Sequence, residues 1–323
     1  QRILEIAPGA VSWSLILFTI WGSVLIPEVV AYYIIAFSVY WLYRSLSVAI
    51  LALIGHFKIQ AAQRYDWMGD VQMFPDWKRV QHVIIIPTFK EPVYMLERTL
   101  AGLASQAFPK KQLHVVMSFE EREGEEAEQK AKWLQQKFEG KFGTILVTFH
   151  PDISGEVKGK SANTAWGAKV AQAEIVGKKK LDKRYLTITS EDADVVLSPQ
   201  YFACLTYKFL DHPKRYRRIW QSAVMYYNNI WRVPVPIRVV ATAWSVVQIY
   251  VLMRQDMLIN FSTYSTSWLM IEKIGFWDTD VIPEDYRLFF KSFFSLKGEV
   301  EVEPIFLPAL ADAAESTSYW KTM

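Results

Sequence analysis

Two pairs of neighbouring acidic residues have the types and spacing that catalysis could use. Asp192 and Asp194 are separated by one residue, and Glu284 and Asp285 are adjacent. Carboxylate oxygens are the ligands that hard divalent cations prefer, and phosphate oxygens can complete the coordination shell. We therefore predict that Asp192 and Asp194 bind Mg²⁺ or Mn²⁺ together with a diphosphate, although turns and helix caps use the same pattern. The second pair opens an expected helix, where it could supply a general base or only stabilise the helix start.

A lysine-containing loop at residues 156–163, with the sequence EVKGKSAN, is the third chemical element. Lys160 could reach a phosphate group, and the start of the helix expected after it favours negative charge. A solvated basic loop would explain the same residues without any ligand. Whether this loop binds a ligand therefore depends on where the strands and helices around it place Lys160.

Strands and helices alternate over about 130 residues, as estimated from apolar runs and helical spacing, which predicts an α/β fold with a doubly wound, mostly parallel sheet. Ligands of such sheets bind beyond the carboxyl ends of the strands, which is where the lysine loop and Asp192 are expected. No strand is followed by the glycine-rich pattern of a dinucleotide-binding fold or by a P-loop, so both of these classes are disfavoured. We expect strands at residues 80–87, 113–119, 144–149 and 185–190, and helices at residues 91–105, 125–138 and 161–176.

The N-terminal 65 residues predict a membrane hairpin. No charged residue occurs from Ile6 to Pro27, which is about the roughly 20 residues that a membrane-spanning helix needs. We interpret residues 7–26 as one span and residues 29–43 as a second, short span, with residues 44–64 lying along the membrane interface. One long second span with Arg44 reaching the headgroups, or a helical hairpin buried in a soluble domain, would be the alternatives.

The basic residues predict the orientation of this hairpin. Its tip has no Lys or Arg. Arg2 lies before the hairpin, and Arg44, Lys58 and Arg64 lie after it. Because cytosolic segments carry the excess of basic residues, both ends of the hairpin are expected in the cytosol. The sequence thus predicts a multi-pass membrane protein in which residues 66–323 form a cytosolic domain.

Composition excludes several classes of protein. A net charge of +3 with 21% charged residues argues against a nucleic-acid-binding protein and against a disordered chain. The single cysteine, Cys204, excludes an internal disulfide framework and a cysteine-rich zinc site. Residues 216–260 interleave aromatic residues with arginines, which is typical of a sugar-binding surface or a membrane interface, and a core strand followed by a buried helix would also fit.

The order of the short motifs resembles that of a known family. The segments IIPTFKE, KSAN, EDAD and PED follow one another along the chain. In this order they resemble the membrane-bound family 2 glycosyltransferases, which include cellulose and hyaluronan synthases and have a GT-A catalytic domain. The resemblance extends over about residues 80–320 and includes the segments FSTYSTS and AAES.

The resemblance implies an inverting transfer of a hexosyl group from a nucleotide-sugar donor to a glycan or lipid-linked acceptor at the lipid bilayer. It implies that Asp192 and Asp194 bind the metal, that Asp285 is the general base with Glu284 beside it, and that the FSTYSTS segment contacts the acceptor. The donor-binding residues that it implies are Pro87, Thr88, Glu91, Glu120, Lys160, Asn163 and Asp192, and the acceptor-binding residues are Ser265, Thr266 and Ser267.

Two features depart from the family pattern. The second strand ends in Glu120 and Glu121, where the family usually has two aspartates or Asp-Gly, and the family's Gln-x-x-Arg-Trp motif is absent. We expect that motif and further membrane helices to lie beyond residue 323. Two other functions stay open: a nucleotidyltransferase, which also places acids at strand ends, and a non-catalytic membrane scaffold with a degenerate transferase fold.

Overall fold

The computed structural model describes residues 2–315 and begins with two long helices, α1 (Arg2–Leu25) and α2 (Pro27–Arg64), joined through Ile26. The helix predicted over residues 7–26 is confirmed as far as Leu25, where α1 ends. The division of the next segment into a short helix over residues 29–43 and a separate stretch to residue 64 is wrong, because α2 runs without a break for 38 residues. No proline interrupts residues 28–64, so nothing in the backbone ends the helix earlier. One long second helix was the alternative interpretation.

Both N-terminal helices expose apolar side chains along most of their length, and α1, α2 and α8 (Val235–Leu252) are long and apolar enough to cross a membrane. The chain divides into two compact units, residues 1–53 and residues 54–323. Within the first unit α1 and α2 lie close together near their connection. There, Gly22 faces Val30 and the ring of Phe18 lies 5.4 Å from that of Tyr33.

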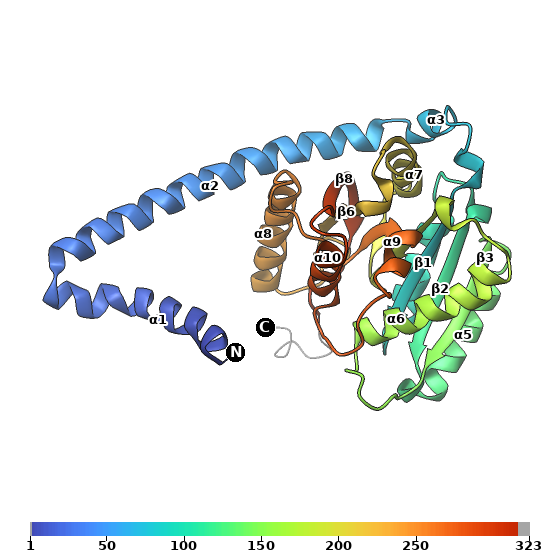
Figure 1. Cartoon of the computed structure of the whole chain (residues 1–323), viewed down its shortest axis with the longest axis horizontal. Helices are drawn as coiled ribbons and strands as arrows, with labels where there is room; N and C mark the ends of the chain where they lie inside the picture. The colour runs from blue at the N-terminus through green and yellow to red at the C-terminus, as the bar shows by residue number, and fades with distance from the viewer. Residues whose placement is uncertain (1, 316–323) are drawn as a thin grey trace. The chain divides into compact units, whose positions relative to one another are not determined.

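The second unit is built on one eight-stranded sheet with the order β3-β2-β1-β4-β7-β6-β8-β5 (Figure 1). Strands β3, β2, β1 and β4 are parallel, so the predicted parallel arrangement is confirmed for this half. In the other half β7 runs antiparallel to β4 and β6, and β5 runs antiparallel to β8, so the sheet as a whole is mixed. The strands are β1 (Gln81–Thr88), β2 (Leu113–Glu120), β3 (Thr144–His150), β4 (Leu186–Ser190), β5 (Val196–Leu197), β6 (Arg218–Met225), β7 (Tyr264–Ser267) and β8 (Glu301–Leu310).

Helices cover both faces of this sheet. Ile84 and Ile86 of β1 belong to a core shared with α4, α5 and α7. Because side chains alternate along a strand, Ile85 points to the opposite face, where it meets α6. The further helices of this unit are α3 (Trp67–Val71), α4 (Val93–Ala104), α5 (Glu125–Lys137), α6 (Lys160–Ala171), α7 (Tyr201–Asp211), α9 (Trp268–Lys273) and α10 (Glu284–Ser295). Short 3₁₀ segments lie at η1 (Trp77–Arg79), η2 (Lys110–Gln112), η3 (Glu121–Glu123), η5 (Lys183–Tyr185) and η6 (Arg215–Arg217), and a π-helical segment, η4 (Gln172–Gly177), follows α6.

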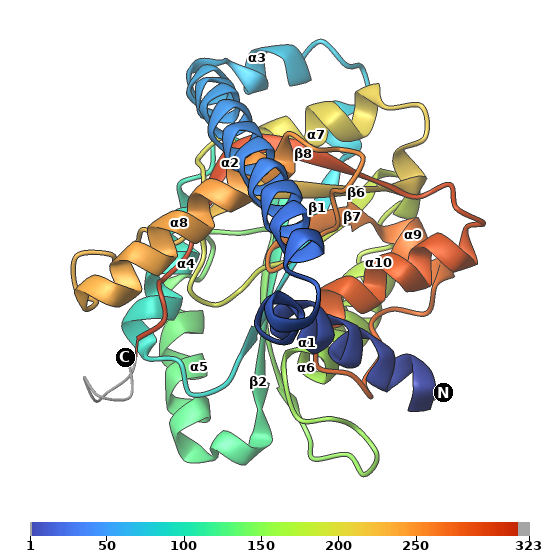
Figure 2. The ribbon, with the colours of Figure 1, turned by 90° about the vertical axis from the view of Figure 1, so that its left-hand side faces the viewer.

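Two helix placements matter for the site. Helix α6 lies directly on β1, because a Cβ atom added to Gly167 would come within 2.9 Å of Ile85 Cγ2. This close approach places the first residue of α6, Lys160, at the carboxyl ends of the parallel strands. Helix α8 packs against β6, and just after that strand Ser245 Oγ accepts a hydrogen bond of 3.0 Å from the Tyr226 amide. Figure 2 shows α5 on one side of β2 and α6 on the other.

Candidate active site

A cavity of about 430 Å³ opens beyond the carboxyl ends of β1 and β4, and we call it the acidic cleft. It brings together most of the residues that the sequence predicts to bind a donor or a metal: Pro87, Thr88, Glu91, Lys160, Asn163, Asp192 and Asp194. These residues come from three separate segments of the chain. Met95, Asn229 and Asp312 also line this cleft, and no sequence motif pointed to them.

The residues after β1 are held in place by Glu91. Thr88 Oγ1 donates a hydrogen bond of 2.6 Å to Glu91 Oε2, and the Phe89 amide donates to the same oxygen. Burial raises the pKa of the Glu91 carboxyl, and these hydrogen bonds offset part of the shift. Glu91 therefore shapes the backbone at the floor of the acidic cleft.

Asn163 ties two strands together at the edge of the cleft. Its amide nitrogen donates to the carbonyl of Ser118 at 2.7 Å and to that of Thr88 at 3.3 Å. Its side-chain oxygen accepts from Ser118 Oγ at 2.6 Å. Because these partners occupy the side chain, Asn163 is placed to hold β1 and β2 in register beneath a ligand.

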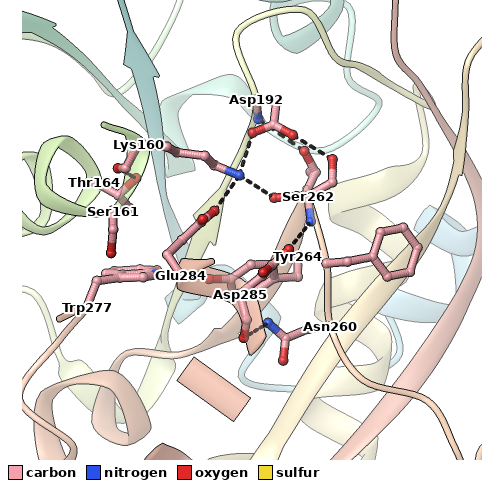
Figure 3. A network of polar contacts seen from close by, with 12 residues as sticks. Lys160, Ser161, Thr164, Asp192, Asn260, Ser262, Tyr264, Trp277, Glu284 and Asp285 are labelled. Carbon is pink, nitrogen blue, oxygen red and sulfur yellow. Dashed lines mark hydrogen bonds and ion pairs between the residues drawn. The ribbon is translucent and has the colours of Figure 1, made fainter. Parts of the chain in front are cut away.

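Lys160 lies at the centre of the acidic cleft and joins both acidic pairs (Figure 3). Its Nζ atom is 2.5 Å from Asp192 Oδ1, 2.7 Å from Glu284 Oε1 and 2.9 Å from the carbonyl oxygen of Ser262. Burial alone would lower the pKa of Lys160, but the charges of Asp192 and Glu284 outweigh this effect and raise it. The lysine is therefore a fixed positive charge between two carboxylates.

The pKa values of the two carboxylates differ because their surroundings differ. Burial alone would raise the pKa of Asp192, but Lys160 and the Ser262 hydroxyl lower it below the ordinary value. Burial raises the pKa of Glu284, and Lys160 offsets this shift only in part. Asp192 is thus the more firmly ionised partner of the lysine.

Ser262 links the two halves of the site, and its role was missed at the level of sequence. Its hydroxyl donates to Asp192 Oδ2 at 2.6 Å, and its amide donates to Asp285 Oδ2 at 3.1 Å. It adopts a positive φ of 56°, a conformation that non-glycine residues adopt rarely and that is often found at functional sites. No hydropathy pattern marks this serine, so only its neighbours in space reveal it.

Asp194 also lines the acidic cleft and is held by the chain after β8. Its Oδ2 atom accepts a hydrogen bond of 3.0 Å from the amide of Asp312, whose carboxylate pairs with Arg98 at 2.6 Å. Burial raises the pKa of Asp194 to about 6, and the negative charge of Asp192 adds to the effect. A cation between the two aspartates would remove this repulsion.

A third acid, Glu191, lies next to this pair. It is fully buried, and neither of its carboxylate oxygens has a hydrogen-bond partner among the described residues. Burial raises the pKa of Glu191 well above its ordinary value and so favours its uncharged form. Asp192 and Asp194, unlike Glu191, line the acidic cleft.

The fit of a divalent cation follows from these two carboxylates. Within residues 2–315, no group of three or more His, Cys, Asp or Glu side chains is arranged to hold a metal on its own. Two carboxylates that face one cleft and repel each other are suited to a hard cation whose remaining ligands come from phosphate and water. Asp192 and Asp194 therefore fit a cation that binds together with a diphosphate.

Asp285 faces a different cavity from the acidic cleft. This cavity, of about 420 Å³, lies between α8 and the start of α10, and we call it the α8–α10 cavity. Ser262 lines it together with Asp285. Because Ser262 contacts both Asp192 of the acidic cleft and Asp285, it lies between the two cavities (Figure 3).

Four residues predicted to bind donor or acceptor lie outside these two cavities. Glu120 is buried, pairs with Arg122 and borders a small separate cavity with His150 and Glu156. The predicted acceptor-binding residues Ser265, Thr266 and Ser267 lie in β7 and are at most 1% exposed.

The hydroxyl groups of these β7 residues already have partners within the protein. Ser265 Oγ contacts the hydroxyl groups of Thr189 and Tyr201, at 2.7 and 2.8 Å. Thr266 donates to a backbone carbonyl of β6, and Ser267 caps α9. Their placement argues against the predicted acceptor contacts, because a β-strand in the middle of a sheet buries its side chains on both faces.

Comparison with known proteins gives the following results. No protein-family model and no curated protein sequence matches the chain. Among solved structures, the mannosyltransferase PcManGT from Pyrobaculum calidifontis, in complex with GDP-Man and Mn²⁺, shares 14% sequence identity at a TM-score of 0.47, and the match covers 84% of this chain and 70% of that one.

TarS from S. aureus is similar to the same extent. The match to TarS covers 73% of this chain and 37% of that one, with 13% identity and a TM-score of 0.46. The fragment TarS 1–349 in complex with UDP-GlcNAc gives 13% identity and a TM-score of 0.48, with 75% of this chain and 64% of that one covered. This chain thus spans less than two thirds of either TarS chain.

Proposed function

We propose that the protein is a membrane-anchored, inverting glycosyltransferase that moves a hexosyl group from a nucleotide-sugar donor to an acceptor hydroxyl. One observation carries this proposal. Lys160 pairs with Asp192 on one side and Glu284 on the other, and Ser262 connects Asp192 to Asp285. A site for a diphosphate and a site for a proton acceptor are thereby held next to each other.

The acidic cleft would bind the donor. Lys160 and the N-terminus of α6 offer positive charge to a diphosphate. Asp192 and Asp194 would hold the divalent cation, which when bound neutralises the charge that develops on the leaving diphosphate. The lysine would keep the same diphosphate oriented as the bond between the sugar C1 and the phosphate oxygen breaks.

Asp285 would act from the other side. It would accept the proton of the acceptor hydroxyl as that oxygen bonds to C1, while the electrons of the broken bond leave with the diphosphate. Asp192, the carboxylate beside the donor site, is engaged through both oxygens by Lys160 and Ser262, which leaves it poorly placed to act as a nucleophile. A single displacement, and therefore inversion at C1, is the mechanism that this arrangement favours.

The N-terminal helices would anchor the enzyme. We infer that α1 and α2 span the bilayer, since few of their apolar side chains are covered, and that both ends of the hairpin face the cytosol. Residues 1–65 would then form the membrane part and residues 66–323 the catalytic domain. This orientation gives the acidic cleft access to cytosolic nucleotide sugars.

The test combines binding and product analysis on the full chain in detergent. UDP- and GDP-sugars are screened for thermal stabilisation with Mn²⁺ or Mg²⁺, and the released nucleotide is identified. We expect metal-dependent stabilisation by at least one donor and release of a nucleoside diphosphate, both lost in Asp192→Asn. Lys158→Met, which alters an exposed lysine paired with Asp152, is the matched control and should behave like the wild type. Release of pyrophosphate would instead indicate a nucleotidyltransferase, and failure of every nucleotide to bind would indicate a scaffold.

A further inference from the structure

One wall of the α8–α10 cavity is aliphatic, and the rest of its lining is aromatic or polar: Tyr226, Trp244, Gln248, Phe261, Ser262, Asp285 and Tyr286. Val247 and Val251 of α8 and Met257 and Ile259 of the following loop line one part. Asp285 and Ser262 lie at the polar part. A ligand that fills this cavity therefore has to combine an apolar segment with a polar group.

The carboxylate of Asp285 can accept a hydrogen bond from a hydroxyl group of such a ligand. Its Oδ2 atom accepts one hydrogen bond from the Ser262 amide at 3.1 Å, and its Oδ1 atom accepts one from the Tyr286 amide at 2.8 Å. Each carboxylate oxygen can accept two hydrogen bonds, so the geometry retains capacity for a hydroxyl donor. The two amides also fix the orientation of the carboxylate.

The apolar wall continues onto the exposed side of α8. No charged residue occurs from residue 239 to residue 253, and Val239 and Val240 are more than 60% exposed. Trp244 lines the cavity and is itself 53% exposed, so it joins the cavity to this surface. The cavity is therefore open toward an apolar surface of the domain.

The start of α8 carries the residues that are typical of a membrane interface. The Arg238 guanidinium stacks on the ring of Trp231, at 5.0 Å from its centroid, and donates to the carbonyl of Ile230. Trp231 is 81% exposed. An apolar helix side flanked by tryptophan and arginine matches a helix that lies along a lipid surface.

We propose that the α8–α10 cavity binds an amphiphile, with its aliphatic chain against Val247 and Val251 and its hydroxyl-bearing head toward Asp285. The assignment of this amphiphile as the acceptor rests on the proposed function. A water-soluble glycan would leave the aliphatic wall unmatched, because its hydroxyl groups find no hydrogen-bond partners at Val247, Val251 and Ile259. The acceptor class is therefore a lipid-carried hydroxyl.

The test measures protection of a single engineered thiol in the full chain, kept soluble by a lipid-free polymer belt. Met257→Cys places a thiol at the cavity wall, where the native side chain is 55% exposed. The natural Cys204 is buried, and burial raises the pKa of its thiol to about 12, so it reacts slowly with maleimide. Met73→Cys, at a position that is 81% exposed and lines none of these cavities, is the matched control.

The probes are methyl, hexyl, octyl and decyl glucoside, which share one head group. Each added methylene should tighten binding by up to roughly fourfold, so decyl glucoside should slow labelling of Met257→Cys at least fivefold at a concentration where methyl glucoside has no effect. Adding Val251→Asn should remove most of the protection, and labelling of Met73→Cys should be unchanged.

Three results would overturn the proposal: equal protection by methyl and decyl glucoside, no protection by either, or equal protection at the Met73→Cys site. Thermal stabilisation by nucleoside diphosphates on the same preparations reports on the proposed function separately. If it is absent while chain-length-dependent protection remains, the cavity binds an amphiphile but the acceptor role fails.

Discussion

Replacing Lys160 by methionine tests the central claim about the acidic cleft. The substitution keeps a long apolar stem and removes the charge that lies 2.5 Å from Asp192 and 2.7 Å from Glu284. Asp192 and Glu284, which share the positive charge of Lys160, are then left without it. The same charge is the one that we assign to the donor diphosphate, so stability and donor binding should both fall.

The size of the stability loss follows from burial. Removing one partner of a buried ion pair costs about 3–5 kcal/mol, and the low end applies here because the lysine side chain is 27% exposed. At roughly 2–4 °C per kcal/mol, a loss of about 3 kcal/mol lowers Tm by roughly 6–12 °C. Without Lys160 the pKa values of Asp192 and Glu284 rise. The loss of stability caused by Lys160→Met should therefore be largest at neutral pH. It should shrink as the pH falls and both acids become protonated.

A double variant separates the structural effect from the functional one. Lys160→Met with Glu284→Gln removes one of the two uncompensated charges and should recover roughly half of the lost stability. Donor nucleotide affinity should stay at least tenfold below the wild type in both variants, because neither keeps the positive charge of Lys160 for the diphosphate. Melting curves and nucleotide titrations on one preparation measure both quantities, and Lys158→Met serves as the charge control.

Recovery of nucleotide affinity together with stability in the double variant would refute the reasoning. Lys160 would then be a structural residue that only neutralises two acids. A Tm unchanged by Lys160→Met would refute the ion-pair geometry itself.

Further predictions concern the acids and the membrane. Asp285→Asn should lower transfer by roughly 10²–10⁴ in single-turnover assays while donor affinity changes by only a few-fold; near-normal transfer with about 1 kcal/mol of lost stability would instead identify Asp285 as a helix cap. Asp194→Asn should abolish metal-dependent nucleotide binding. The pKa of Asp194 is raised to about 6, so its ionisation destabilises the fold as the pH rises from about 4 to about 6. The same variant should therefore have a free energy of unfolding on the order of 1–3 kcal/mol higher than the wild type, measured in urea at pH 7.5. In the wild type, Mn²⁺-dependent nucleotide affinity should fall as the pH drops below about 6, whereas an affinity that is independent of pH would contradict metal binding by Asp194. A reporter fused after residue 65 should be accessible only from the cytosol, and an extracytoplasmic signal would overturn the inferred topology.

The parallel half of the sheet could be predicted from the sequence because its strands are rich in apolar and β-branched residues. The stretch VQHVIIIP predicted β1, and the actual strand, Gln81–Thr88, differs by one residue at each end. Strand β7 could not be predicted in this way, because its sequence is YSTS and it has no apolar run. It forms a strand because β4 and β6 pair with it on both sides.

The acidic cleft was largely predictable for the same reason. Parallel strands end at one edge of a sheet, so residues directly after β1 and β4 are brought together whatever the details of packing. Thr88, Lys160 and Asp192 meet there as expected. Asp312 and Asn229 could not be predicted to line the cleft. They lie far along the chain from β1 and β4, and no local sequence pattern shows that they fold back toward these strands.

The sequence by itself determined the apolar N-terminal segments, the parallel strands and the identity of the acids and of the lysine among them, but not the length of the second helix. The tertiary structure alone decided which of these groups touch. It showed that Lys160 joins Asp192 to Glu284, that Ser262 separates the acidic cleft from the α8–α10 cavity, and that Ser265–Ser267 are buried. The physical reason is that apolar periodicity reports how a segment faces water, whereas contacts between polar side chains depend on long-range packing that leaves no local pattern in the sequence.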